Sequence, residues 1–294
     1  MDSYQKHLFK LFEDFRETPT WPNYPPYKQG EYFEEYFLRR YREEDLKTKR
    51  YFLPIAWSSC YINHRDVPLP HLQQALNSLN QDEEYFMVGV HDDSPREILP
   101  PKTIKFLAGG NKGDDNTTPI PVLVNKIPES YLKNLSYEKT HLASFVGSLT
   151  HPIRVNMCRQ HSNNPDFLLQ VKQWSPTVPE NQLQNFLSIS AKSHFVLCPR
   201  GYAPTSCRLY ETMQLQAVPV YISDKFWLPW ADELDWESIC VFIKEEEIGY
   251  MDLILKDCLY SDEYERKRKK IKEIYDKYFT FDVILSKILE RVNQ

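Results

Sequence analysis

Short apolar runs alternate with longer segments of helical periodicity along most of this chain, and that alternation restricts the fold more than any other feature. We expect strands at the apolar runs 51–57, 85–90, 104–108, 121–124, 142–147, 167–171, 195–198, 218–222 and 239–243. Helical patterns lie at about 3–16, 69–80, 152–160, 181–191, 206–216, 247–258, 261–278 and 282–292. Strands that alternate with helices favour parallel sheets with helices on both faces.

The strands divide best into two sheets. The segment 125–140 is polar, contains Pro128 and separates two groups of strands. We therefore expect an α/β protein of GT-B-like form, with two Rossmann-like halves and a cleft between them. Residues 1–138 form the first half and residues 139–294 the second. The last helix, near 282–292, is the element that can cross back onto the first half.

The composition argues against several classes of protein. A net charge of −5 at pH 7 disfavours a nucleic acid as the main partner. No apolar run approaches the ~20 residues that span a bilayer, and MDSYQKHLFKLFEDF is an acidic amphipathic pattern rather than a signal peptide. The cysteines form no CxxC pair, and Cys60, Cys158, Cys198 and Cys240 lie in or beside apolar runs. We expect a soluble, cytoplasmic protein with buried thiols.

The segment CPRGYAPTSCRLYE (198–211) leaves one apolar run and enters a helical pattern. Such a segment turns at the carboxyl edge of a parallel sheet, where α/β proteins bind their ligands. Gly201 lets backbone approach closely, and Thr205 or Ser206 can cap the helix. The free N–H groups and positive dipole end of that helix would favour a phosphate.

Arg208 lies in the first turn of this helix, where the dipole disfavours a cation, and Glu211 shares its face. One interpretation is a surface ion pair between the two side chains. The other gives Arg208 to a diphosphate and Glu211 to a ribose diol, because a carboxylate accepts hydrogen bonds from two hydroxyls. The spacing alone leaves both interpretations open.

The segment FVGSLTHPIR (145–154) repeats this pattern. A strand ends at Gly147, Pro152 takes the first helical position and Arg154 projects from the first turn. Two helix starts in one half, each with an arginine opposed by the dipole, favour one shared anion. The alternative is a separate surface ion pair for each arginine.

Acidic residues follow a strand of the first half. The run 85–90 leads into His91, Asp92 and Asp93, and the acidic pair can act as a general base, as metal ligands or as a turn former.

The segment SCYINHRD (59–66) follows the first strand in a similar way. Its His64 and Asp66 are further candidates, although a loop or core histidine is the plainer interpretation of His64. The chain contains no GxGxxG, GxxxxGK[ST], HExxH or Asp-x-Asp motif. A bound diphosphate would therefore be neutralised by arginines and helix ends rather than by a metal.

The stretch SHFVLCPRGYAPTSCRLYETMQLQAVPVYISDKFWLPW (193–230) resembles the exostosin family, glycosyltransferase family 47. The pattern of that family is close to S-K-F-x-L-C-P-R-G, S-x-R-x-x-E and x-P-V-x-x-x-D. The resemblance extends more weakly through 145–154, and the first 80 residues contribute little. It implies a GT-B fold whose C-terminal half binds the nucleotide sugar, and inverting transfer without a metal.

The resemblance also implies a donor-binding set from the second half: Arg154, Arg200, Gly201, Ser206, Arg208, Glu211, Tyr221 and Asp224. Of these, Arg154 and Arg208 face the diphosphate and Glu211 the ribose. Eukaryotic relatives usually carry a membrane anchor, and often a second catalytic domain. This chain is more similar to the short soluble members of the family.

These observations predict an inverting, metal-independent glycosyltransferase that needs no cofactor. It would move a sugar from a UDP-sugar to a hydroxyl of an oligosaccharide or other glycan acceptor. We expect the base in the first half, with Asp92 or Asp93 preferred over Asp66 and His64. The alternative is a catalytically silent module of the same fold that binds a nucleotide sugar or a glycan.

Overall fold

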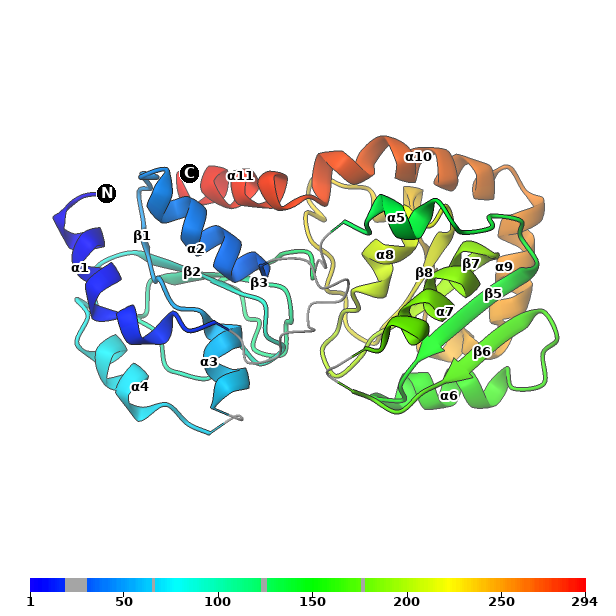
Figure 1. The fold of residues 1–294 in the computed structure, drawn as a ribbon, viewed down its shortest axis with the longest axis horizontal. Coiled ribbons are helices and arrows are strands. Elements are labelled where there is room, and N and C mark those ends of the chain that lie inside the picture. The colour runs from blue at the N-terminus through cyan, green and yellow to red at the C-terminus, as the bar shows by residue number, and fades with distance from the viewer. Residues whose placement is uncertain (19–30, 65–66, 123–125, 176–177) are drawn as a thin grey trace.

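The computed structural model describes residues 1–18, 31–64, 67–122, 126–175 and 178–294, which form two β-sheets flanked by helices. Figure 1 shows the two halves side by side, the blue-to-cyan half with one sheet and the green-to-orange half with the other. All neighbouring strands that the structure describes pair in parallel. The expected fold class, two Rossmann-like α/β halves, is confirmed.

The first sheet has the strand order β1-β2-β3-β4, with bounds Tyr51–Phe52, Tyr85–Gly89, Thr103–Leu107 and Thr117–Pro119. The second sheet has the order β6-β5-β7-β8-β9. Its strands, in chain order from β5 to β9, are His141–Gly147, Phe167–Val171, Ser193–Pro199, Val218–Ile222 and Val241–Ile243. Strands β2 and β8 are buried at every position, which explains why they read as continuous apolar runs.

The helices of the first half are α1 (Ser3–Leu11), α2 (Phe33–Glu43), α3 (Trp57–Asn63) and α4 (Pro70–Asn77), with a 3-10 turn η1 (Glu13–Phe15). The short α5 (Glu129–Leu132) lies between the two sheets in sequence. The second half has the 3-10 turns η3 (Trp236–Ser238) and η4 (Glu245–Tyr250). Its helices are α6 (Pro152–Gln160), α7 (Glu180–Ala191), α8 (Arg208–Gln214), α9 (Met251–Tyr260) and α10 (Glu263–Tyr278), and α10 is followed by α11 (Phe281–Val292).

Two predicted strands are wrong in extent or place. The run 51–57 is a strand only over its first two residues, and helix α3 begins at Trp57. Pro54 lacks the N–H that would continue the ladder. The predicted strand at 121–124 is not formed at its described residues, and β4 is instead the polar segment 117–119, an edge strand held by backbone pairing to β3. Residues 123 and 124 lie outside the described part.

Helices α2, α3 and α5 were not expected from the sequence. Helix α2 carries a clear helical signal, since Phe33, Phe37 and Tyr41 recur every four residues and are all buried. Of the cysteines expected to be buried, Cys158 is only half-buried. Among the described residues, no helix is both long and apolar enough to cross a membrane.

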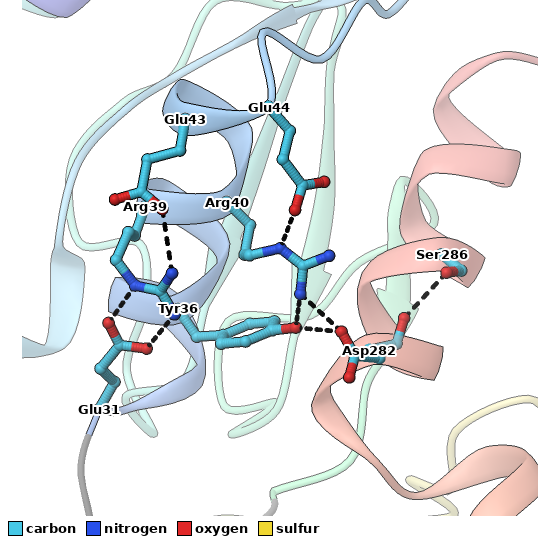
Figure 2. A network of polar contacts seen from close by, with 8 residues as sticks. All are labelled: Glu31, Tyr36, Arg39, Arg40, Glu43, Glu44, Asp282 and Ser286. Carbon is cyan, nitrogen blue, oxygen red and sulfur yellow. Dashed lines mark hydrogen bonds and ion pairs between the residues drawn. The ribbon is translucent and has the colours of Figure 1, made fainter.

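Helix α11 packs against α2 of the first half, although it follows α10 of the second (Figure 1). The rings of Phe33 and Phe281 lie 5.3 Å apart. Figure 2 shows Tyr36 and Arg40 of α2 converging on Asp282 of α11. The Arg40 guanidinium lies 2.6 Å from the Asp282 carboxylate. The boundary between residues 138 and 139 stays a prediction.

A second contact between the halves is made by Trp227, which follows β8. Its indole N–H donates to the carbonyl of Ala108 at 3.0 Å, and its side chain belongs to the core of the first half. The ring lies on the backbone of Gly110 and Gly113, where an added Cβ would come within 2.4 Å of it. Glycine is needed at both positions because only a bare backbone leaves room for the indole.

Replacement of Trp227 tests this contact. We expect Trp227→Ala to lower the free energy of unfolding by about 3–5 kcal/mol, because it empties a buried site that both halves enclose. Urea denaturation measures the loss. The neighbouring Phe226→Ala is the matched control, since Phe226 is 61% exposed. A loss below about 1 kcal/mol for Trp227→Ala would show that the indole does not join the halves.

Candidate functional site

A pocket of about 240 Å³ opens at the carboxyl ends of strands β5 and β6. The two strand ends are joined by the backbone N–H of Lys172, which donates to the carbonyl of Gly147 at 2.9 Å. Side chains from the segment after β6, from α7 and from α8 complete the wall. The residues that matter for its chemistry are Gly147, Lys172, Trp174, Phe186, Arg208 and Glu211.

Arg208 is one of the cationic side chains that line this pocket, together with Lys172. Its Nη2 donates to the carbonyl of Val146 at 2.8 Å, and its guanidinium lies over the ring of Phe145 at 4.8 Å. Its Nε is buried with no hydrogen-bond partner in the described part of the chain. Within the described residues, no ion pair joins Arg208 to Glu211. The first interpretation of these two side chains, a surface ion pair, is therefore not what the structure shows. The pocket therefore contains a guanidinium that forms no ion pair with the described carboxylates, and the Glu211 carboxylate lines the same pocket.

Arg154 lies behind the pocket wall and is buried. Its guanidinium donates to three backbone carbonyls: Ser148 at 2.9 Å, Pro199 at 3.1 Å and Arg200 at 2.8 Å. Burial and the positive charge of Arg208 lower the pKa of Arg154 to about 9. The side chain clamps the ends of β5 and β7 together instead of opening onto the pocket.

The loop after β7 connects this clamp to the rest of the site. Gly201 is buried, and a Cβ there would lie 3.1 Å from Nη2 of Arg154. Ser206 lies two residues before Arg208 and accepts a hydrogen bond from its guanidinium at 3.2 Å. The exposed Tyr202 reaches the first half, where its hydroxyl donates to Asp93 at 3.3 Å.

Three other members of the predicted donor set hold loops rather than line the Arg208 pocket. Arg200 pairs with Asp224 at 2.6 Å. Burial acts to raise the pKa of Asp224, but the hydrogen bond and charge of Arg200 leave it lowered. The buried Tyr221 donates to the carbonyl of Lys225 at 3.0 Å and accepts from the N–H of Trp227 at 3.1 Å. Tyr221 and Asp224 thus shape the segment that contacts the first half.

In the first half, the loop after β2 separates the two candidate carboxylates. Asp93 is tied to Asn111 at 2.9 Å and to Tyr202, and these hydrogen bonds lower its pKa although burial opposes them. The Asp92 carboxylate has no hydrogen-bond or ion-pair partner within the described ranges. Burial, with a smaller contribution from Asp93, raises the pKa of Asp92 to about 6. Gly109 makes this close packing possible, since its Cβ would lie 2.4 Å from the Asp92 Cα.

The remaining first-half candidates are placed differently from the expectation. His64 caps the carboxyl end of α3 and lies 3.5 Å from the Glu17 carboxylate, because residues 57–63 form a helix instead of a strand. The His91 Nδ1 accepts the N–H of Asp93 at 3.1 Å and so belongs to the turn. Asp66 lies outside the described residues.

Sequence reasoning missed Lys172 and Trp174. Both directly follow the predicted strand 167–171, and the rule that ligands bind at carboxyl ends of parallel strands would have found them. Burial lowers the pKa of Lys172, and Trp174 is 58% exposed at the pocket rim. The described residues contain no group of three or more His, Cys, Asp or Glu side chains that could hold a metal ion.

Two halves, each with a parallel sheet flanked by helices, and a pocket at the carboxyl edge of the second sheet are the architecture of the GT-B class. Residues 55–258 match the sequence model of the Exostosin GT47 domain. The chain therefore belongs to the exostosin GT47 family.

Several curated relatives are plant proteins. A probable glucuronosyltransferase of rice, Oryza sativa subsp. japonica, is 34% identical over 125 residues, which cover 42% of this chain and 28% of that protein. The probable β-1,4-xylosyltransferase IRX10L of Arabidopsis thaliana is 48% identical over 61 residues, covering 21% of this chain and 15% of that protein. The chain thus matches less than a third of the length of either relative.

Solved structures with a similar fold are more distant in sequence. An α-glucosyltransferase in complex with UDP and DNA is 12% identical, with a TM-score of 0.45, over 76% of this chain and 75% of that one. A glycosyltransferase from Rickettsia africae is 9% identical, with a TM-score of 0.43, over 88% of this chain and 79% of that one.

The contact between Gly147 and Arg208 gives a test of the pocket. A Cβ at Gly147 would lie 2.6 Å from Nη2 of Arg208, so Gly147→Ala should push the guanidinium off the Val146 carbonyl. We expect inorganic pyrophosphate, titrated by calorimetry, to bind roughly tenfold more weakly, a loss of about 1.4 kcal/mol. Gly249→Ala is the matched control, because its Cβ would meet only the flexible end of Gln160. Equal affinity in both variants would remove Arg208 from the anion site.

Proposed function

We propose that the protein is an inverting, metal-independent glycosyltransferase that moves a sugar from a UDP-sugar to a hydroxyl of a glycan acceptor. The observation that carries this proposal is the loop after β7. It borders the Arg154 clamp behind the cationic pocket, and its Tyr202 contacts Asp93 beside Asp92. This loop therefore connects the cationic pocket, which suits a leaving diphosphate, with the Asp92 carboxylate, which suits a general base. The names of the family relatives, probable glucuronosyltransferases and xylosyltransferases, support the same reaction class.

In this proposal, the pocket has a suitable side chain for each part of the nucleotide. Arg208 and Lys172 supply positive charge for the diphosphate, and the Glu211 carboxylate suits the two ribose hydroxyls. Trp174 offers an exposed indole at the rim on which a base can stack. Arg154 contributes charge from behind the wall and keeps the two strand ends in place.

Transfer is a single displacement. The acceptor oxygen forms a bond to the anomeric carbon while the bond from that carbon to the diphosphate breaks, which inverts the configuration. Asp92 takes the proton of the acceptor hydroxyl, and its pKa of about 6 keeps it ionised at neutral pH yet basic enough to accept a proton. Arg208 and Lys172 stabilise the charge that develops on the departing UDP.

The first prediction concerns the donor. Arg208→Ala should weaken UDP binding and lower kcat/KM together, by about 2–4 kcal/mol of transition-state stabilisation. Glu211→Ala should mainly raise the KM for the donor. Arg159→Ala is the control, since Arg159 is an exposed arginine of α6 bonded to Asn156. An unchanged kcat/KM in folded Arg208→Ala would contradict the assignment of Arg208 to the donor. If the unmodified protein binds UDP but turns over no donor, the alternative of a catalytically silent binding module would be favoured.

The second prediction concerns the base. Asp92→Asn should lower turnover by about 10²–10⁴-fold and leave the affinity for UDP nearly intact. Asp92 acts as a base only when ionised, so kcat/KM should fall as the pH drops through about 6. Asp93→Asn, which loses the hydrogen bonds to Asn111 and Tyr202, should cost stability more than turnover. A pH profile flat from 5 to 8, or normal turnover in Asp92→Asn, would place the base elsewhere.

The third prediction concerns metals. Because the pocket offers guanidinium and ammonium groups, and no metal-binding cluster occurs among the described residues, activity should survive exhaustive treatment with EDTA. The measurement is UDP release before and after chelation. Loss of activity that manganese restores would show that a metal neutralises the diphosphate.

A further inference from the structure

Glu34 is a buried carboxylate that the proposed reaction does not use. It is the second residue of α2 and is 2% exposed, among the aromatic side chains of the first-half core. Its two carboxylate oxygens accept three hydrogen bonds. Ser58 donates two of them, from its backbone N–H at 2.8 Å and from its hydroxyl at 2.9 Å, and the backbone N–H of Val90 donates the third.

These bonds join three elements at the carboxyl edge of the first sheet. Glu34 belongs to α2, Ser58 to the first turn of α3, and Val90 follows β2 directly. A carboxyl group buried in an apolar core costs free energy unless donors surround it, and here two backbone N–H groups of the edge and the Ser58 hydroxyl supply them. The carboxylate therefore fixes where β2 ends relative to both helices.

The loop that starts at Val90 carries Asp92 two residues later. Its far end is held as well, because the backbone N–H of Arg96 donates to the hydroxyl of Tyr61 at 2.9 Å. Tyr61 lies on α3, as Ser58 does, and its ring also packs on His91 at 5.3 Å. Hydrogen bonds thus hold the loop at both ends, to Glu34 at its start and to Tyr61 at its end, and we call these two residues its anchors.

We propose that Glu34 is a positioning residue for the transfer reaction, which holds the Asp92 carboxylate in place through Val90 and Ser58. The proposal rests on the assignment of Asp92 as the base. Neither anchor contacts the Arg208 pocket, so Glu34 should affect proton removal and leave donor binding alone. The Asp92 carboxylate has no described partner that would orient it. Its orientation therefore depends on the two anchors of its loop.

A double-mutant cycle tests this role. In Glu34→Gln the side-chain NH₂ would face donors, so at least one of the three bonds is lost while the shape is kept. We expect turnover per UDP-binding site to fall about 10–100-fold, with the UDP dissociation constant unchanged within about twofold. In the Asp92→Asn background, Glu34→Gln should change the residual turnover by less than about twofold, because a residue that acts through Asp92 has nothing left to position.

Two further variants keep the test decisive. Ser58→Ala removes one of the three bonds, keeps the backbone donor and should give a smaller loss of the same kind, so it replaces Glu34→Gln if that variant does not fold. Glu35→Gln is the matched control, since Glu35 lies in the same helical turn and, among the described residues, accepts a hydrogen bond only from the N–H of Tyr32, at 3.0 Å. Its turnover should stay within about twofold of the parent.

The outcomes separate the two assignments. If Asp92→Asn is inactive while Glu34→Gln and Ser58→Ala keep normal turnover, Glu34 does not position the base. The same holds if Glu34→Gln lowers turnover equally with and without Asp92. If Asp92→Asn keeps normal turnover, the base assignment itself fails, and the role of Glu34 fails with it.

Discussion

The second half depends on one buried guanidinium. Arg154 donates to three carbonyls at the carboxyl ends of β5 and β7, those of Ser148, Pro199 and Arg200. A buried cation is costly to desolvate, and its removal would leave three carbonyls without this donor, of which the Pro199 bond is buried and the other two are partly buried. The clamp lies against Gly201 in the loop after β7, and Tyr202 of the same loop contacts Asp93 of the first half.

Arg154 also contributes to the positive charge at this edge of the second half. Arg154 and Arg208 lie close enough for each charge to disfavour the other, and neither has a carboxylate partner in the described structure. In the first half the situation is reversed, because burial and Asp93 disfavour the charge of Asp92. The second half thus favours binding of an anion, and the first half favours uptake of a proton by Asp92. A displacement that releases a diphosphate and a proton needs these two environments on opposite sides of the reacting carbon.

The parts of this arrangement that the sequence predicts are those set by local rules. The runs at 85–90, 142–147 and 218–222 became strands because a strand buried on both faces must be apolar throughout. Arg208 and Glu211 could be placed at one pocket because both stand at a helix start after such a strand. The functions of Arg154 and Glu34 could not, since each bonds backbone groups from distant segments. The strand predicted over 51–57 failed for a related reason: its apolar character serves the core around Trp57 and Tyr61, and not a ladder.

The most direct test of the account is a crystal structure of the protein with UDP bound. We expect the diphosphate within hydrogen-bond distance of Arg208, the ribose hydroxyls at Glu211 and the nucleotide base against Trp174, with Arg154 still bonded to its three carbonyls. UDP bound outside the pocket at the carboxyl ends of β5 and β6, or an Arg208 that keeps its distance from the phosphates, would contradict it.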